Sequence, residues 1–195
     1  MSKYDFFLNI PLMNAAGFLG FAPDTRGPVD LSTLGAFVTN PVSLDPRTPA
    51  HGPSYTGLTG GFMLHTGHPN PGFKAMLRRY AAQWSRSPLP VVVHLLARGV
   101  EDAGRMARQL ENVDGVMAIE LGLPPEAGSD LAAALLEAAR GELPVVVRVP
   151  LERAAPLAAA LSKAGAAAIS LGAPRGAMPG ANQKLLTGRI YGPAV

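Results

Sequence analysis

The chain has 195 residues, of which 48% are hydrophobic and 16% are charged, a composition that allows one domain with a sizeable core and excludes a disordered chain. The net charge is +3, and the basic residues are spread along the chain rather than gathered in a stripe, which argues against a nucleic-acid partner. The absence of cysteine excludes disulfides and thiolate metal sites.

The first residues lack the layout of a secretory signal peptide, and no apolar run approaches the ~20 residues of a membrane-spanning helix. We therefore expect a cytoplasmic protein without membrane contacts. Small molecules and other protein chains remain as the expected partners.

The N-terminal part of the chain predicts short strands separated by small residues. Residues 6–14 are expected to form the first strand, and residues 35–40 the second. Ala15-Ala16-Gly17 follows the first strand with small residues, which let a backbone approach a ligand or allow a tight turn. The Pro- and Gly-rich stretch 41–71 is expected to be a long connection, and such a connection inside a compact domain is usually functional or a sign that elements within it have been missed.

The end of this connection, residues 60–72, carries two of the four histidines and immediately precedes an amphipathic helix. Its glycines and prolines predict a loop held in one shape at the mouth of a scaffold. His65 and His68 flank Gly67 and are candidates for a proton-accepting base or for metal ligands. Without a nearby carboxylate they are also typical of ordinary loop histidines, so no metal site is predicted.

From Gly72 onward the sequence alternates amphipathic helices with apolar strands. Apolar residues recur at helical spacing over 73–84, and the runs beyond are continuous enough for strands buried on both faces. Strands are predicted to start at Val91, Val116, Val145 and Ala167, and helices to cover about 103–110, 129–141 and 152–164.

This βα repeat predicts a parallel α/β fold, because parallel strands need helical crossovers. A doubly wound sheet and a (β/α)₈ barrel both fit the repeat. The barrel is favoured, because no Gly-x-Gly-x-x-Gly follows the first strand and the unusual loop residues all follow strands.

Two residues with candidate roles, His94 and Glu120, lie within predicted strands. His94 is expected to be a satisfied interior histidine, with a role in a site as the alternative. Glu120 is expected to form a structural pair with Arg148, with a place at the rim as the alternative.

Several segments form an ordered series along the chain: Asn14-Ala15-Ala16-Gly17, residues 35–47, the loop residues Gly67, Pro69, Asn70, Gly72 and Phe73, the strands Ala118–Leu121 and Val145–Pro150, and Thr187-Gly188 with Tyr191-Gly192-Pro193-Ala194. This series resembles the dihydroorotate dehydrogenase family in order and spacing. The resemblance implies a flavin mononucleotide (FMN)-dependent (β/α)₈ barrel that oxidises dihydroorotate in pyrimidine biosynthesis. About six of the eight βα units are expected here, as one domain over residues 1–195.

The resemblance also implies roles for individual residues. His65, His68 and Arg148 are the candidates for catalysis. Cofactor-binding roles are implied for Ala15, Ala16, Gly17, Asn40, Arg148 and Gly192, and substrate-binding roles for Thr66, Gly67, His68 and Asn70.

Departures from the family pattern fall on functional positions. Pro125 stands where the family has a Cys or Ser base, and proline can neither accept nor give a proton. Asn40 and Arg148 stand where the family has lysines, and Leu64 and Gly122 where it has asparagines. The usual base is therefore replaced or missing.

Three interpretations follow from these departures. The first is an FMN oxidoreductase of the dihydroorotate dehydrogenase type whose base has been replaced. The second is a non-catalytic barrel fragment that acts in binding or assembly, and the third is a truncated form of a longer protein. An open barrel edge invites pairing, so we expect self-association or a partner chain at that edge.

Overall fold

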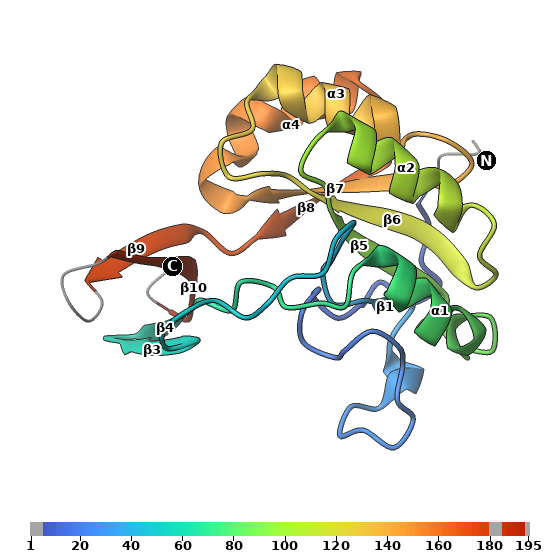
Figure 1. Ribbon diagram of the computed structural model, residues 1–195, viewed down its shortest axis with the longest axis horizontal. Coiled ribbons are helices and arrows are strands. Elements are labelled where there is room, and N and C mark those ends of the chain that lie inside the picture. The colour runs from blue at the N-terminus through green and yellow to red at the C-terminus, as the bar shows by residue number, and fades with distance from the viewer. Residues whose placement is uncertain (1–5, 180–184, 194–195) are drawn as a thin grey trace.

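A parallel sheet forms the centre of the molecule, whose computed structural model describes residues 6–179 and 185–193. Its strands follow the order β1-β5-β6-β7-β8, and β2 also pairs with β5 (Figure 1). All of these pairings are parallel. The bounds are β1 (Phe37–Val38), β2 (Val42–Ser43), β5 (Val91–Leu96), β6 (Val116–Gly122), β7 (Val145–Pro150) and β8 (Ala168–Gly172).

Helices connect these parallel strands, and α2, α3 and α4 lie side by side over one face of the sheet (Figure 1). No helix in the described ranges is long and apolar enough to cross a membrane. The bounds are α1 (Phe73–Trp84), α2 (Val100–Leu110), α3 (Ser129–Ala139) and α4 (Ala154–Lys163), with short 3₁₀ turns η1 (Leu31–Thr33) and η2 (Leu151–Arg153).

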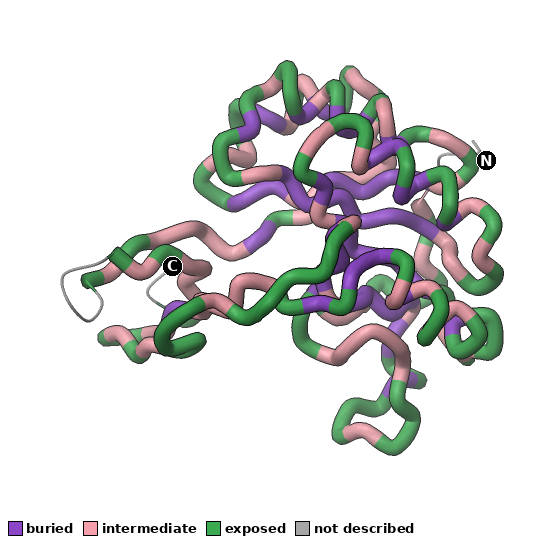
Figure 2. Tube along the Cα trace, in the orientation of Figure 1, coloured by how far each residue is buried: buried purple, intermediate pink, exposed green. Residues whose placement is uncertain are grey.

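The core lies between this sheet and the helices, and the buried part of the chain follows β5, β6 and β7 (Figure 2). The continuous apolar runs are therefore strands covered on both sides, as predicted. Trp84 is fully buried at the end of α1. Its indole nitrogen donates a hydrogen bond to the Phe21 carbonyl oxygen at 2.7 Å, which ties the N-terminal segment to the core.

Consecutive parallel strands with helical crossovers make the fold a partial (β/α)₈ barrel, which confirms the predicted fold class. The prediction of a strand over 6–14 is wrong, because this segment forms a single parallel bridge, Met13 to Ala36. A side chain replaces further backbone pairing here. The Asn14 amide donates to the Val38 carbonyl at 2.7 Å and accepts from the Val38 N–H at 2.8 Å.

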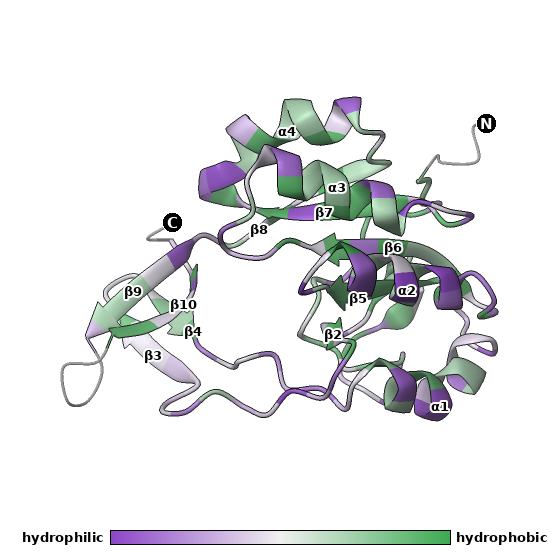
Figure 3. Cartoon of the chain, turned by 45° about the horizontal axis from the view of Figure 1, so that its top comes forward, coloured by the Kyte–Doolittle hydropathy of each residue, from purple (hydrophilic) through white to green (hydrophobic). Residues whose placement is uncertain are grey.

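A second, antiparallel sheet stands apart from the helices (Figures 1 and 3). Its order is β3-β4-β10-β9. The prediction that 41–71 is a connection without strands is therefore wrong, because the stretch contains β2 and a hairpin of β3 and β4. The bounds of the second sheet are β3 (Tyr55–Leu58), β4 (Gly61–Leu64), β9 (Arg175–Pro179) and β10 (Leu185–Tyr191).

Stacked aromatic rings join the strands of this second sheet. Phe62 lies between Tyr55 and Tyr191, with ring centroids 5.4 Å apart on each side. Such cross-strand aromatic pairs contribute roughly 0.5–1.5 kcal/mol beyond their buried area. They fix β10, near the C-terminal end of the described chain, to the hairpin of β3 and β4.

Candidate functional site

A cleft of about 710 Å³ lies between the two sheets. One side is formed at the carboxyl ends of parallel strands, by Leu96, Gly122 and Arg148, and the other by the second sheet, including Leu64 and Arg189. Its volume falls within the roughly 300–1,000 Å³ of small-molecule and cofactor sites. The carboxyl ends of the strands are also where barrel enzymes place their active sites.

Four adjacent strands each contribute one polar side chain to a network at the floor of this cleft: His94 from β5, Glu120 from β6, Arg148 from β7 and Ser170 from β8. The Glu120 carboxylate accepts from His94 Nδ1 at 2.5 Å and from Ser170 Oγ at 2.6 Å. Arg148 Nη1 lies 3.7 Å from the same carboxylate. The predicted Glu120–Arg148 pair and the interior position of His94 are both confirmed.

These partners keep Glu120 ionised although it is buried. Burial raises the pKa of a carboxyl group. Here the charges of His94 and Arg148, with hydrogen bonds from His94 and Ser170, outweigh that effect and lower the pKa of Glu120 to about 2. Glu120 is therefore a fixed negative charge that orients the guanidinium group of Arg148 and the ring of His94.

Gly122 gives the ring of His94 its space. A Cβ atom at Gly122 would lie 2.8 Å from His94 Nε2. Because a carboxylate only accepts hydrogen bonds, His94 Nδ1 carries the proton of that bond. Nε2 is the nitrogen next to Gly122, and both residues line the cleft.

The loop that carries His65 and His68 is held in one shape, as its composition predicts. His65 Nδ1 donates to the Thr187 carbonyl of β10 at 2.5 Å, and Arg47 Nε donates to the Gly67 carbonyl at 3.1 Å. The backbone N–H of His68 donates to the Thr66 hydroxyl at 3.2 Å. His68 has a φ of 54°, a left-handed conformation that such contacts must maintain.

His68 is uncharged at neutral pH. Burial lowers its pKa to about 4, and the positive charges of His94, Arg47, Arg189 and Arg148 act in the same direction. A neutral imidazole can accept a proton, but a pKa this low makes it a weak base.

The structure brings most of the predicted site residues together. Those that line the cleft are Ala16, Gly17, His65, Thr66, Gly67, His68 and Arg148.

Four predicted site residues, Ala15, Asn40, Asn70 and Gly192, are absent from the lining of this cleft. The Asn40 amide oxygen accepts from the Gly20 N–H at 3.1 Å. The Asn70 amide is buried and binds the loop itself, donating to the His68 carbonyl at 3.0 Å and accepting from the Gly72 N–H at 3.0 Å. Ligand-binding roles for these four stay predictions. Ala194, part of the motif after Tyr191, lies outside the described residues.

Sequence reasoning missed the arginines that surround the cleft, namely Arg98, Arg175 and Arg189, with Arg47 noted only as part of a motif. They come from loops and from β9 and β10, so no periodic pattern marks them. The arginines far outnumber the acidic side chains of the lining, where Glu126 stands alone among the described residues. No group of three or more His, Asp or Glu side chains suited to a metal ion occurs within the described ranges.

The comparisons with known proteins all point to the same family. The family model described as dihydroorotate dehydrogenase matches residues 4–149. The catalytic subunit of dihydroorotate dehydrogenase B (NAD(+)) from Desulforudis audaxviator is 32% identical over 116 residues, which cover 60% of this chain and 38% of that protein. The same subunit from Pelobacter propionicus is 27% identical over 178 residues, which cover 84% of this chain and 59% of that protein.

A solved structure supports the fold. The crystal structure of an Eimeria tenella DHODH in complex with ferulenol superposes with a TM-score of 0.66 at 12% identity, covering 99% of this chain and 66% of that one. The chain thus spans well under two thirds of the length of the curated relatives that it matches.

The buried network makes Glu120 a main determinant of stability. We expect Glu120→Gln to lower the free energy of unfolding by about 3–5 kcal/mol, because it leaves Arg148 and His94 without their buried partner. Urea unfolding measures this change. Glu101→Gln is the control, since Glu101 is exposed in the first turn of α2 and its loss is worth about 1 kcal/mol or less. Equal stabilities of the two variants would contradict the network.

The lowered pKa of His68 predicts a pH dependence of stability. Its reference pKa is 6.5 and its folded pKa is about 4, so between these values the unfolded chain binds more protons. The free energy of unfolding therefore falls as the pH falls from 6.5 towards 4.

His68→Gln should flatten this fall between pH 6.5 and pH 4.5, while any contribution of Glu120, whose pKa falls from 4.5 to about 2 on folding, is common to both proteins. Chemical unfolding of both proteins across this range measures the difference. His51→Gln, at an exposed position outside the cleft, is the control. A slope that His68→Gln leaves unchanged would show that His68 is not held neutral.

Proposed function

The chain belongs to the dihydroorotate dehydrogenase family, and from that membership we propose that it is an FMN-dependent oxidoreductase of the dihydroorotate dehydrogenase type, in pyrimidine biosynthesis, with the usual base replaced. One observation carries the proposal. The family match over residues 4–149 includes the parallel strands from β1 to β7, and three of these strands, β5, β6 and β7, line the cleft that contains Arg148.

The residues of the cleft suit the two chemical parts of FMN. A planar ring system needs a site with small and apolar walls, which Ala16, Gly17, Phe18 and Leu123 offer. A phosphate group needs positive charge, which the arginines supply. When bound, FMN takes up the hydride that leaves the substrate, which is chemistry that side chains do not provide.

Arg148 is the residue that we propose for stabilising negative charge in this cleft. Its guanidinium group is held by Glu120 at 3.7 Å, and its side chain is only 14% exposed. A cation fixed before the reaction needs no reorganisation as charge develops, which makes such stabilisation effective. Arginine differs from the family's lysine in having a planar and permanently charged group. The substitution therefore keeps the positive charge but carries it on a guanidinium group instead of an ammonium group.

His65 is the residue that we propose as proton acceptor. Pro125 lines the cleft but has no ionisable group. A carbonyl oxygen only accepts hydrogen bonds, so the bond from His65 Nδ1 to Thr187 places the proton of the neutral ring on Nδ1. Nε2 is then the free acceptor. His68, whose pKa is lowered to about 4, is a weak base.

The alternative function, a barrel fragment that acts in binding or assembly, is favoured by the edge of the parallel sheet. Strand β8 pairs with β7 alone among the described strands, and Leu171 within it is 60% exposed. We propose that a second copy of this chain or a partner chain pairs with this edge and extends the barrel, because open edges of a sheet invite pairing.

The assignment of His65 is tested by dihydroorotate-dependent dye reduction on the FMN-loaded protein. We expect His65→Gln to lower kcat by about 10²–10⁴-fold, the usual contribution of a general base. His51→Gln should keep the rate, since His51 is exposed and does not line the cleft. An unchanged rate in His65→Gln would exclude this residue as the base, and an inactive wild-type protein would favour the assembly alternative.

The covered edge is tested by light scattering of the purified chain. We expect a mass above that of one chain, either for the purified chain alone or after a partner chain has been added. Leu171→Lys places a charge on the exposed edge and should abolish the association. Leu151→Lys, at another exposed leucine, is the control. A wild-type chain that stays monomeric and binds no partner would contradict the proposal.

A further inference from the structure

Two arginines face each other across the strands β9 and β10. Arg175 and Arg189 are directly opposite partners in this antiparallel pair, and both line the cleft. Like charges at directly opposite positions destabilise a sheet. The pair therefore has an unfavourable interaction that a bound anion would relieve.

A third guanidinium group lies close to this pair. A Cβ atom built on Gly172 would lie 3.0 Å from Arg148 Nε and 3.3 Å from Arg189 Nη1, so both groups approach the same point in space. Burial lowers the pKa of Arg189, and the charges of Arg175 and Arg148 act in the same direction. The positive charge on this side of the cleft is thus concentrated and partly removed from water.

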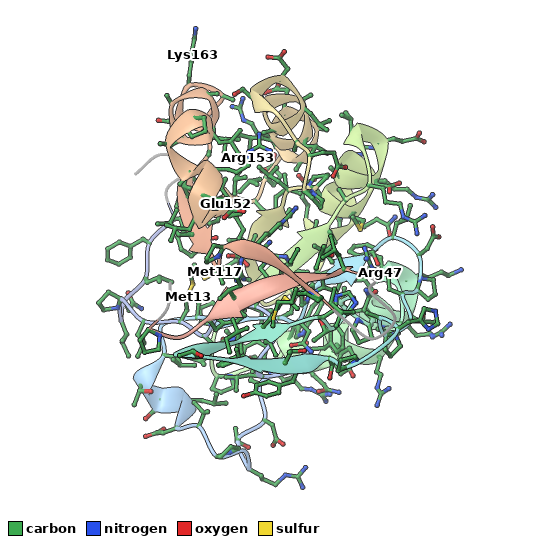
Figure 4. The ribbon with its side chains drawn as sticks, turned by 90° about the vertical axis from the view of Figure 1, so that its left-hand side faces the viewer. Met13, Arg47, Met117, Glu152, Arg153 and Lys163 are labelled. Atoms are coloured by element: carbon green, nitrogen blue, oxygen red, sulfur yellow. The ribbon has the colours of Figure 1, made fainter. Side chains whose placement is uncertain are left out.

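Carboxylates do not neutralise the pair. Within the described ranges, no ion pair of 4.0 Å or less joins Arg175 or Arg189 to an acidic side chain. Glu152 lies in η2, the turn that immediately precedes α4, and is close to β9 (Figure 4). Its carboxylate accepts from the backbone N–H of Arg175 at 3.3 Å, and together with Glu126 it only partly opposes the lowering of the pKa of Arg175, whose main cause is burial. Arg189 Nη1 donates to the Ala173 carbonyl at 2.6 Å, which fixes its direction and leaves its other N–H groups for a ligand.

We propose that Arg175 and Arg189 form an oxyanion-binding site, for a phosphate or carboxylate group of a small ligand, on the second-sheet side of the cleft. Guanidinium groups bind such planar or tetrahedral oxyanions through paired, charge-assisted hydrogen bonds. This inference deepens the proposed function and rests on it for the identity of the ligand. The oxyanion is then either the phosphate of FMN or the carboxylate of the substrate.

Four probes separate these sources: FMN, riboflavin (the same ring system without the phosphate), orotate and inorganic phosphate. Binding is measured by flavin fluorescence titration for the first two and by the rise in Tm for the others, since a ligand that binds only the folded protein stabilises it. The variant is Arg175→Gln/Arg189→Gln. The control is Arg105→Gln/Arg108→Gln, which removes two exposed arginines from α2 and changes the net charge equally.

A phosphate site predicts that the wild-type protein binds FMN more tightly than riboflavin. The variant should then lose about 10- to 100-fold in FMN affinity, the loss expected for charge-assisted hydrogen bonds, while riboflavin binding and the control stay unchanged. A carboxylate site predicts the same loss for orotate and none for FMN. Either result supports the oxyanion site, and equal binding of all four probes by wild type and variant would overturn it.

The outcome for inorganic phosphate separates this inference from the proposed function. If neither flavin binds but phosphate raises the Tm of the wild-type protein and not that of the variant, the FMN proposal fails and the oxyanion site stands. If flavins bind both proteins equally, and orotate and phosphate also do not distinguish them, the oxyanion site fails and the FMN proposal stands. Arg175→Gln alone, without ligand and at low salt, should be at least as stable as wild type, because it removes the opposed like charges. A lower stability would show that the pair is structural and would count against the site.

Discussion

The buried carboxylate of Glu120 is the group on which the arrangement of the cleft depends. Its partners are His94 of β5, Arg148 of β7 and Ser170 of β8. Together with Glu120 of β6, four consecutive strands each contribute one polar side chain. A buried charge is unfavourable unless it is paired and hydrogen-bonded, so the register of these strands must bring all three partners to it. The parallel sheet thus delivers a fixed cation to the floor of the cleft.

The second sheet supplies the opposite side of the cleft and two of its four other arginines, Arg175 and Arg189. The loop that follows β4 is tied to β10 through His65 and Thr187, while the hairpin of β3 and β4 is stacked on β10 through Tyr191. These contacts connect residues that are far apart in the sequence, so the shape of the site depends on the C-terminal strands. Arg148 on the floor, held by Glu120, and the arginines of the second sheet opposite it together produce a cleft suited to an anionic ligand.

The sequence predicts the parallel half of this molecule because buried strands such as Val91–Leu96 must be apolar throughout, and their helices follow a simple period. It also predicts the pair of Glu120 and Arg148, since the two residues lie on adjacent parallel strands of one sheet. The second sheet could not be predicted in the same way. Gly57, Gly61, Gly176 and Gly188 interrupt the alternation that marks a strand, and the pairing of β4 with β10 joins distant segments. The use of the Asn70 amide within its own loop likewise depends on tertiary geometry.

The most direct measurement is the visible absorption spectrum of the purified chain after FMN has been added and the protein desalted. The proposed function predicts that a flavin band remains with the protein. A spectrum without that band would mean that the cleft does not hold FMN by itself. It would contradict the assignment of this chain as a flavin-binding oxidoreductase and direct attention to its role in assembly.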